Sequence, residues 1–188
     1  HGSIACIGHH CPNVKINLLC RRPKEFSHKI VAKTDNCIWK YKGDLVGKVN
    51  KVSSEAKDVI PGSKMVIICS PSHVSLDILS QIKDYVDPDA FVGCIYGGGC
   101  FDLQATSVLG SKIGEQGITV FGMQFVPFLC KATKYGSEAE IYGPKNYICA
   151  TAFPLSRIDK ITQLASYLWA TPCASIPNFL SLTLTPSN

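Results

Sequence analysis

Residues 64–99 read KMVIICSPSHVSLDILSQIKDYVDPDAFVGCIYGGG, and this stretch decides the fold class. Its first six residues form an apolar run, which is typical of a strand buried on both faces of a parallel sheet. Apolar residues then recur at near-helical spacing from Val74 to Val86, and Asp87-Pro88 ends the pattern. A second apolar run, Ala90–Tyr96, precedes three glycines. This order of strand, helix and strand predicts an α/β fold with a mainly parallel sheet and helices on both faces.

The N-terminal side of this stretch contributes further strands. Val14–Cys20 is a short β-rich run that ends at Arg21-Arg22-Pro23. Two more runs, Cys37–Tyr41 and Leu45–Val52, flank Lys42-Gly43-Asp44 and predict a small hairpin with a glycine turn. We expect Val14–Cys20 to join the strands Lys64–Cys69 and Ala90–Tyr96 in the same sheet.

The C-terminal side continues the alternation. A second helical pattern follows the three glycines, and Ile118–Phe121 predicts a third buried strand. Residues 128–153 alternate like antiparallel strands, with a turn expected at Gly143-Pro144. Ser156, with Asp159 three residues later, resembles a capping box and predicts the start of a last long helix.

Length and composition bound the number of domains and the class of protein. The chain has 188 residues and a mass of 20.4 kDa, of which 46% are hydrophobic and 18% charged. These values favour one globular domain over residues 1–188 and argue against disorder. No apolar run approaches the roughly 18 residues that a membrane-spanning helix needs, so we predict no membrane partner.

The cysteines favour a reducing compartment. There are ten, but none forms a Cys-x-x-Cys pair, so the common zinc-ribbon and thioredoxin spacings are absent. Several lie inside apolar runs, where a free thiol behaves as a small buried hydrophobic group. We predict free thiols without disulfides or zinc, Cys94 and Cys100 included, and a cytoplasmic location.

Positive charge is concentrated in the first third of the chain. Residues 1–60 hold eleven Lys and Arg against five Asp and Glu, whereas residues 61–188 hold eight against nine. A basic segment can bind a phosphate-bearing ligand or nucleic acid, or it can simply form a solvated face. Because basic and aromatic residues do not interleave and no nucleic-acid motif occurs, we predict that nucleic acid is not a partner.

Unusual residues follow three of the predicted strands. They are Arg21-Arg22, Ser70-Pro71-Ser72 and Tyr96-Gly97-Gly98-Gly99. Ligands of doubly wound sheets bind outside the carboxyl ends of the strands. Three glycines let a ligand approach the backbone and reach its N–H groups, although a plain turn into the next helix explains them equally well.

The arginine pair indicates a particular ligand. Arginine after the second strand of a dinucleotide-binding fold suits the 2′-phosphate of NADP, whereas an acidic residue binds the ribose hydroxyl of NAD. No carboxylate follows Arg21 and Arg22 until Glu25. The alternative is a solvated strand end. The G-x-G-x-x-G fingerprint is absent, and no histidine lies in an arrangement that identifies a metal site or a catalytic base.

Taken together, these strand ends resemble the NAD(P)-binding domain of the octopine/nopaline (opine) dehydrogenase family. The resemblance covers essentially the whole chain, and His1-Gly2 is similar to the tail of the family's Gly-Asn-x-x-His phosphate loop. It is firmest at Lys64–His73, at Phe91–Gln104, at Phe125–Lys145 with its Phe-x-Pro-Phe-x-Cys-Lys-Ala core, and at Leu182–Asn188.

The resemblance implies an enzyme that reductively condenses an α-keto acid with the amino group of an amino acid, using NADH or NADPH. It implies that His1 and Gly2 belong to the cofactor site. Arg21 and Arg22 would then bind the 2′-phosphate of NADP, Ser70 and Pro71 would lie on the adenosine side, and Tyr96–Gly99 near the nicotinamide.

The resemblance also implies parts that this sequence lacks. The expected fold is a Rossmann-like, doubly wound sheet without its first, central strand, which would leave the two neighbouring strands with open edges and a poorly stable fragment. The family's acid–base histidine and helical domain would follow Asn188, so we expect no catalytic residue and no activity in residues 1–188 alone. The alternative is a non-catalytic relative that serves as a binding module in a larger assembly.

Overall fold

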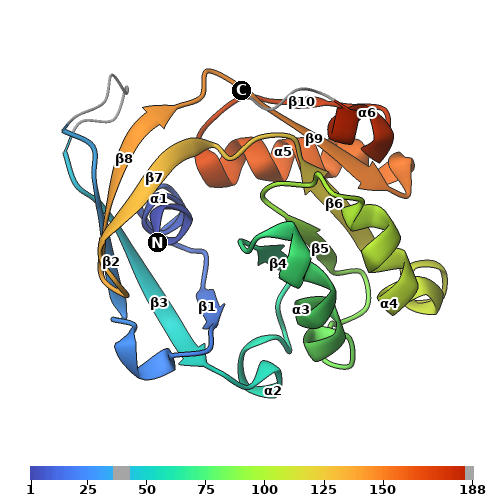
Figure 1. Cartoon of the computed structure of the whole chain (residues 1–188), viewed down its shortest axis with the longest axis horizontal. Coiled ribbons are helices and arrows are strands. Elements are labelled where there is room, and N and C mark those ends of the chain that lie inside the picture. Colours follow the sequence, from blue (N-terminus) through green and yellow to red (C-terminus); the bar gives the residue numbers. More distant parts are fainter. Residues whose placement is uncertain (36–42, 185–188) are drawn as a thin grey trace. The chain divides into compact units, whose positions relative to one another are not determined.

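The computed structural model describes residues 1–35 and 43–184 (Figure 1). Contacts within the chain group these residues into two compact units. Unit 1 consists of His1–Val59, Pro127–Asn146 and Ala165–Thr171, and unit 2 of the segments Ile60–Val126, Tyr147–Leu164 and Pro172 onward.

Unit 1 is built on a mixed five-stranded sheet with the order β1-β3-β2-β8-β7. Strands β1 and β3 are parallel, as are β2 and β8, whereas β2 pairs antiparallel with β3 and β7 with β8. Its helices are α1, which packs on β3, and the short α2. The elements are α1 (Gly2–His10), β1 (Ile16–Leu19), the 3-10 turn η1 (Pro23–Glu25), β2 (Lys29–Lys33), β3 (Leu45–Ser53), α2 (Ala56–Val59), β7 (Phe128–Lys134) and β8 (Glu138–Pro144).

Unit 2 is built on a second five-stranded sheet with the order β10-β9-β6-β5-β4. Strands β4, β5 and β6 are parallel, and β9 runs antiparallel to β6. Every residue of β5 and β6 is buried. The elements are β4 (Met65–Ile68), η2 (Ser72–Val74), α3 (Ser75–Ile82), β5 (Phe91–Cys94), α4 (Phe101–Glu115), β6 (Thr119–Met123), β9 (Ile148–Phe153), η3 (Leu155–Arg157), α5 (Ile158–Trp169), β10 (Cys173–Ser175) and α6 (Phe179–Leu184). The end of α5, from Ala165, belongs to unit 1.

The α/β fold with mixed, mostly parallel sheets agrees with the sequence analysis. The strands expected at 14–20, 64–69, 90–96 and 118–121 form as β1, β4, β5 and β6, and helices α3, α4 and α5 follow the expected patterns. However, β1 lies in the sheet of unit 1 and not beside β4 and β5. Helix α3 also ends at Ile82, four residues before Val86.

Strand β4 is less buried than its apolar sequence predicts. Only Ile68 is buried, and Met65, Val66 and Ile67 remain partly exposed. The reason is topological, because β4 is the terminal strand of its sheet and pairs with β5 on one side only among the described residues. Strand β1 is likewise terminal in unit 1, and none of its residues is buried.

Three local predictions are corrected. Strand β3 pairs with β2, a strand that was not expected, and the predicted hairpin strand 37–41 lies outside the described residues. Gly143-Pro144 ends β8, and the chain reverses between β7 and β8 at residues 135–137 instead. Ser156 lies within the 3-10 turn η3 and therefore does not precede the helix as a cap.

Two further findings concern membrane-spanning helices and the cysteine thiols. In the part of the chain that the structure describes, no helix is long and apolar enough to cross a membrane. Nine cysteines are free thiols there, and Cys37 lies outside the described residues.

Glycine permits a close contact between a helix and a strand in unit 1. A Cβ atom on Gly47 of β3 would collide with the carbonyl oxygen of Ile4 in α1, and a Cβ on Gly8 would lie 2.5 Å from the Cα of Gly47. Backbone atoms cannot move aside as a flexible side chain can. We therefore attribute the seating of α1 on β3 to these two glycines.

We predict that Gly47→Ala lowers the free energy of unfolding by about 1–3 kcal/mol, because the added methyl group overpacks the contact with α1. The matched control is Gly110→Ala in α4, where a Cβ meets nothing within 4 Å. That control should raise stability by about 0.5–1 kcal/mol, because alanine favours a helix more than glycine does. Urea unfolding of both variants checks the prediction, and equal stability of the two would contradict it.

Candidate functional site

The carboxyl ends of β4, β5 and β6 meet at one edge of the unit 2 sheet. The three strands are parallel and in register, with Ile68 opposite Cys94 and Cys94 opposite Gly122. Ser70-Pro71 and Tyr96–Gly99 follow β4 and β5 directly. The structure therefore brings these predicted residues to the same edge, where ligands of such sheets bind.

The glycine turn after β5 is held against β6 by its backbone. The Gly97 N–H donates to the carbonyl of Met123 at 2.7 Å, and a Cβ on Gly97 would lie 2.9 Å from the Cα of Gly122. Gly97 and Gly98 are buried, whereas Tyr96 and Gly99 are exposed. A side chain at Gly97 would therefore push the turn away from the sheet edge.

The same turn leads into α4. Gly99 has a φ of +72°, and a Cβ there would lie 3.1 Å from the Cβ of Ser72. Cys100 is the exposed N-terminal flanking residue of α4, and Gln104 donates from Nε2 to the Gly99 carbonyl at 3.2 Å. The first N–H groups of a helix have no partner within the helix, so this turn can donate hydrogen bonds to a polar or anionic ligand.

Unit 1 holds the arginine pair after β1. Arg21 is exposed. The Cζ of Arg22 lies 4.3 Å from the centre of the Tyr135 ring, and its Nη1 lies 3.1 Å from Oε2 of Glu25. The arginine expected to bind phosphate is thus already in contact with an aromatic ring and a carboxylate.

His1 lies beside the same tyrosine. Its ring stacks on Phe26 at a centroid distance of 5.1 Å and meets the edge of Tyr135 at 5.5 Å. The Gly136 N–H donates to Nε2 of His1 at 2.7 Å, so this nitrogen accepts a hydrogen bond. Gly2 is buried, and a Cβ there would collide with Phe128 and Cys130 of β7. The structure therefore groups His1 and Arg22 around Tyr135 and seats Gly2 against β7.

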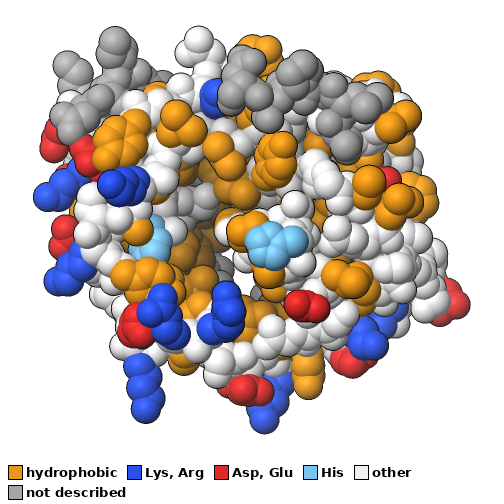
Figure 2. All heavy atoms as spheres, in the orientation of Figure 1, with side chains coloured by type: hydrophobic (Ala, Val, Ile, Leu, Met, Phe, Trp, Pro, Cys, Tyr) orange, Lys and Arg blue, Asp and Glu red, His pale blue; other side chains and the backbone are white. Residues whose placement is uncertain are grey.

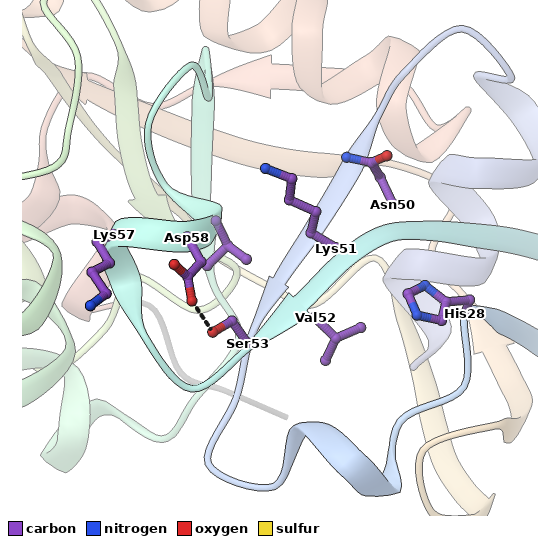
Figure 3. A pocket seen from close by; sticks show the side chains of 8 residues that line it. His28, Asn50, Lys51, Val52, Ser53, Lys57 and Asp58 are labelled. Atoms are coloured by element: carbon purple, nitrogen blue, oxygen red, sulfur yellow. Dashed lines mark hydrogen bonds between the residues drawn. The ribbon is translucent and has the colours of Figure 1, made fainter.

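A pocket of about 590 Å³ lies on unit 1 at the end of β3 (Figure 3). Its lining includes His28, Lys51 and Lys57, with Ser53 donating to Asp58 at 2.7 Å. None of the residues predicted from the sequence lines it. Figure 3 shows the two lysine side chains pointing in different directions, so they do not converge on a common point.

Figure 2 shows Lys and Arg side chains on the left and along the lower edge of the molecule, with several Asp and Glu side chains among them. Residues 1–60, which include Arg21 and Arg22, hold eleven Lys and Arg against five Asp and Glu, and such an excess of positive charge attracts anions.

Sequence reasoning missed Tyr135 and the role of Glu25. Tyr135 is 113 positions from Arg22 in the sequence, so no local pattern relates the two. The spacing of Arg22 and Glu25 did contain a signal, because residues three apart in a 3-10 turn lie directly above one another.

Comparisons with known proteins rest on structure. No protein-family model and no curated protein matches the chain. Octopine dehydrogenase in complex with NADH and agmatine matches 96% of this chain with a TM-score of 0.81 and 15% identity. The present chain therefore has the fold of the Rossmann-like domain of octopine dehydrogenase.

Other solved structures show the same likeness. NADP⁺-bound yersinopine dehydrogenase matches 93% of this chain with a TM-score of 0.71 and 11% identity. A 2-dehydropantoate 2-reductase from Geobacter metallireducens matches 93% with a TM-score of 0.68 and 15% identity. The matches cover 47%, 45% and 54% of the respective chains, so this chain spans about half the length of the structures it resembles.

We predict that Cys100 reacts with iodoacetamide much faster than Cys6 at pH 8. Burial, and secondarily the nearby Cys11 thiol, raise the pKa of Cys6 to about 12, so only about one molecule in ten thousand carries the reactive thiolate. Cys100 is exposed beside the glycine turn. Peptide mapping by mass spectrometry measures both sites. Equal rates for the folded protein would contradict the structure, whereas unfolding in guanidinium should make the rates converge.

Proposed function

We propose that residues 1–188 form the cofactor-binding domain of a cytoplasmic, opine dehydrogenase-like oxidoreductase. The enzyme would condense an α-keto acid with the amino group of an amino acid at the expense of NADPH or NADH. The observation that carries this proposal is the match in fold to octopine dehydrogenase, combined with ligand-accessible residues at the carboxyl edge of a parallel sheet.

Each predicted site residue has a role in this proposal. Arg21 and Arg22 bind the 2′-phosphate of NADP, and His1 and Gly2 form part of the phosphate loop. In unit 2, Ser70 and Pro71 lie on the adenosine side of the cofactor and Tyr96–Gly99 near the nicotinamide. The exposed Tyr96 and Gly99 of the same turn support the last assignment, because they leave this edge of the sheet open to a ligand.

The proposal includes one further strand of the Rossmann-like sheet. Strands β1 and β4 are each a terminal strand of their sheet, and three apolar residues of β4 are partly exposed. Unprotected apolar edge strands pair readily with another strand. We infer that a further strand pairs with β4 at this edge, and that residues 1–188 without it are poorly stable.

The test of the proposed reaction uses the full-length protein with NADPH or NADH, pyruvate and a panel of amino acids. Oxidation of the cofactor that requires both the keto acid and an amino acid is the expected result. Cofactor oxidation with the keto acid alone would instead indicate a hydroxy-acid dehydrogenase. Cofactor binding without turnover of any substrate pair would favour the alternative, a non-catalytic module of a larger assembly.

We predict that replacing both Arg21 and Arg22 with alanine weakens NADPH binding by about one to two orders of magnitude for each bond to the phosphate that is lost. A charge-assisted hydrogen bond to phosphate is worth roughly 1.5–3 kcal/mol, and NADH lacks the 2′-phosphate. Calorimetric titration of the full-length variant with each cofactor measures the effect. The prediction fails if the variant loses affinity for NADH and NADPH equally.

A further inference from the structure

Glu25 forms an ion pair with Arg22, the side chain that the proposed function assigns to phosphate binding. Arg22 is the N-terminal flanking residue of the 3-10 turn Pro23–Glu25, and the Glu25 N–H donates to the Arg22 carbonyl at 3.1 Å. Proline at the first position favours this turn because its φ is already fixed. This tight turn brings the carboxylate of Glu25 to within 3.1 Å of the guanidinium of Arg22, three residues earlier.

The pair is fixed in place by more than its own turn. The Ser27 N–H donates to the Gly136 carbonyl at 2.8 Å, which joins the segment after the turn to the reversal between β7 and β8. Tyr135 in that reversal provides the ring under the Arg22 guanidinium. Arg22 is therefore covered on one face by Tyr135 and on one edge by Glu25, so part of its hydrogen-bonding capacity is already used.

A 2′-phosphate at Arg22 would meet this carboxylate. Phosphate and carboxylate are both acceptors, so they compete for the same guanidinium N–H groups. The ion pair is open to solvent, with 59% of the Arg22 and 48% of the Glu25 side chain exposed, so it is weak enough for a ligand to displace.

We propose that Glu25 sets cofactor selectivity by holding Arg22, and so lowers the preference of the protein for NADPH over NADH. This inference rests on the proposed function, since it concerns the same cofactor site. Glu25 acts through Arg22 and is a positioning residue that need not touch the nicotinamide or the substrates.

The experiment compares NADPH and NADH affinities of the full-length wild type with those of Glu25→Gln. The amide keeps the shape of the side chain and removes its charge. We expect NADPH affinity to rise about three- to tenfold while NADH affinity changes less than about twofold, as suits the loss of one exposed competing charge. The matched control is Glu115→Gln at the far end of α4, which removes the same charge and should leave both affinities unchanged.

A second comparison tests whether the effect passes through Arg22. In the Arg22→Ala background, Glu25→Gln should change NADPH affinity less than twofold, because the carboxylate has no guanidinium left to hold. A full three- to tenfold gain in that background would overturn the mechanism and indicate direct repulsion of the phosphate. An unchanged NADPH-to-NADH ratio for Glu25→Gln alone would overturn the inference, although the proposed function would stand. A wild type that binds neither cofactor would overturn both.

Discussion

The contact between Gly97 and Gly122 determines the shape of the candidate site in unit 2. The Gly97 backbone lies so close to β6 that a Cβ would approach the Cα of Gly122 to 2.9 Å, and a Cβ on Gly122 would in turn collide with Phe179 of α6. The turn, the strand and the last helix are thus packed together through two residues without side chains. This packing keeps the glycine turn at the sheet edge, where the first N–H groups of α4 are accessible to a ligand.

Electrostatics dominate the residues that follow β1 in unit 1. Residues 1–60 hold an excess of Lys and Arg, yet Arg22 is paired with Glu25 and contacts the ring of Tyr135. A phosphate at Arg22 would therefore compete with the Glu25 carboxylate for part of the guanidinium. Under the proposed function, this pairing would make discrimination between NADPH and NADH weaker than two free arginines would provide.

Local patterns predicted most of the elements in unit 2. Apolar runs such as Lys64–Cys69 and Ala90–Tyr96 are strand-sized and stand next to turn residues, so their type does not depend on distant contacts. The pairing of strands was harder to predict. Strand β2 lacked a clear pattern and was missed, and β9 pairs with β6 across 25 residues or more of intervening chain.

The residues of the candidate site also differ in whether local sequence patterns could predict them. The strand ends at Arg21-Arg22, Ser70-Pro71 and Tyr96–Gly99 could be found from sequence, because each directly follows its own strand. The contact of Arg22 with Tyr135 could not be found from sequence, because Tyr135 lies in the turn between β7 and β8, far from Arg22 along the chain. The pocket at the end of β3 was missed because its lining residues are ordinary surface side chains that only the fold brings together.

The most direct measurement of the central claim is a crystal structure of the full-length protein with NADPH bound. The account predicts the 2′-phosphate within hydrogen-bonding distance of the Arg21 or Arg22 guanidinium, and the nicotinamide beside the backbone of Gly97 and Gly98. Density for NADPH at any other place on the chain, with Arg22 still paired to Glu25 and the glycine turn free, would contradict it.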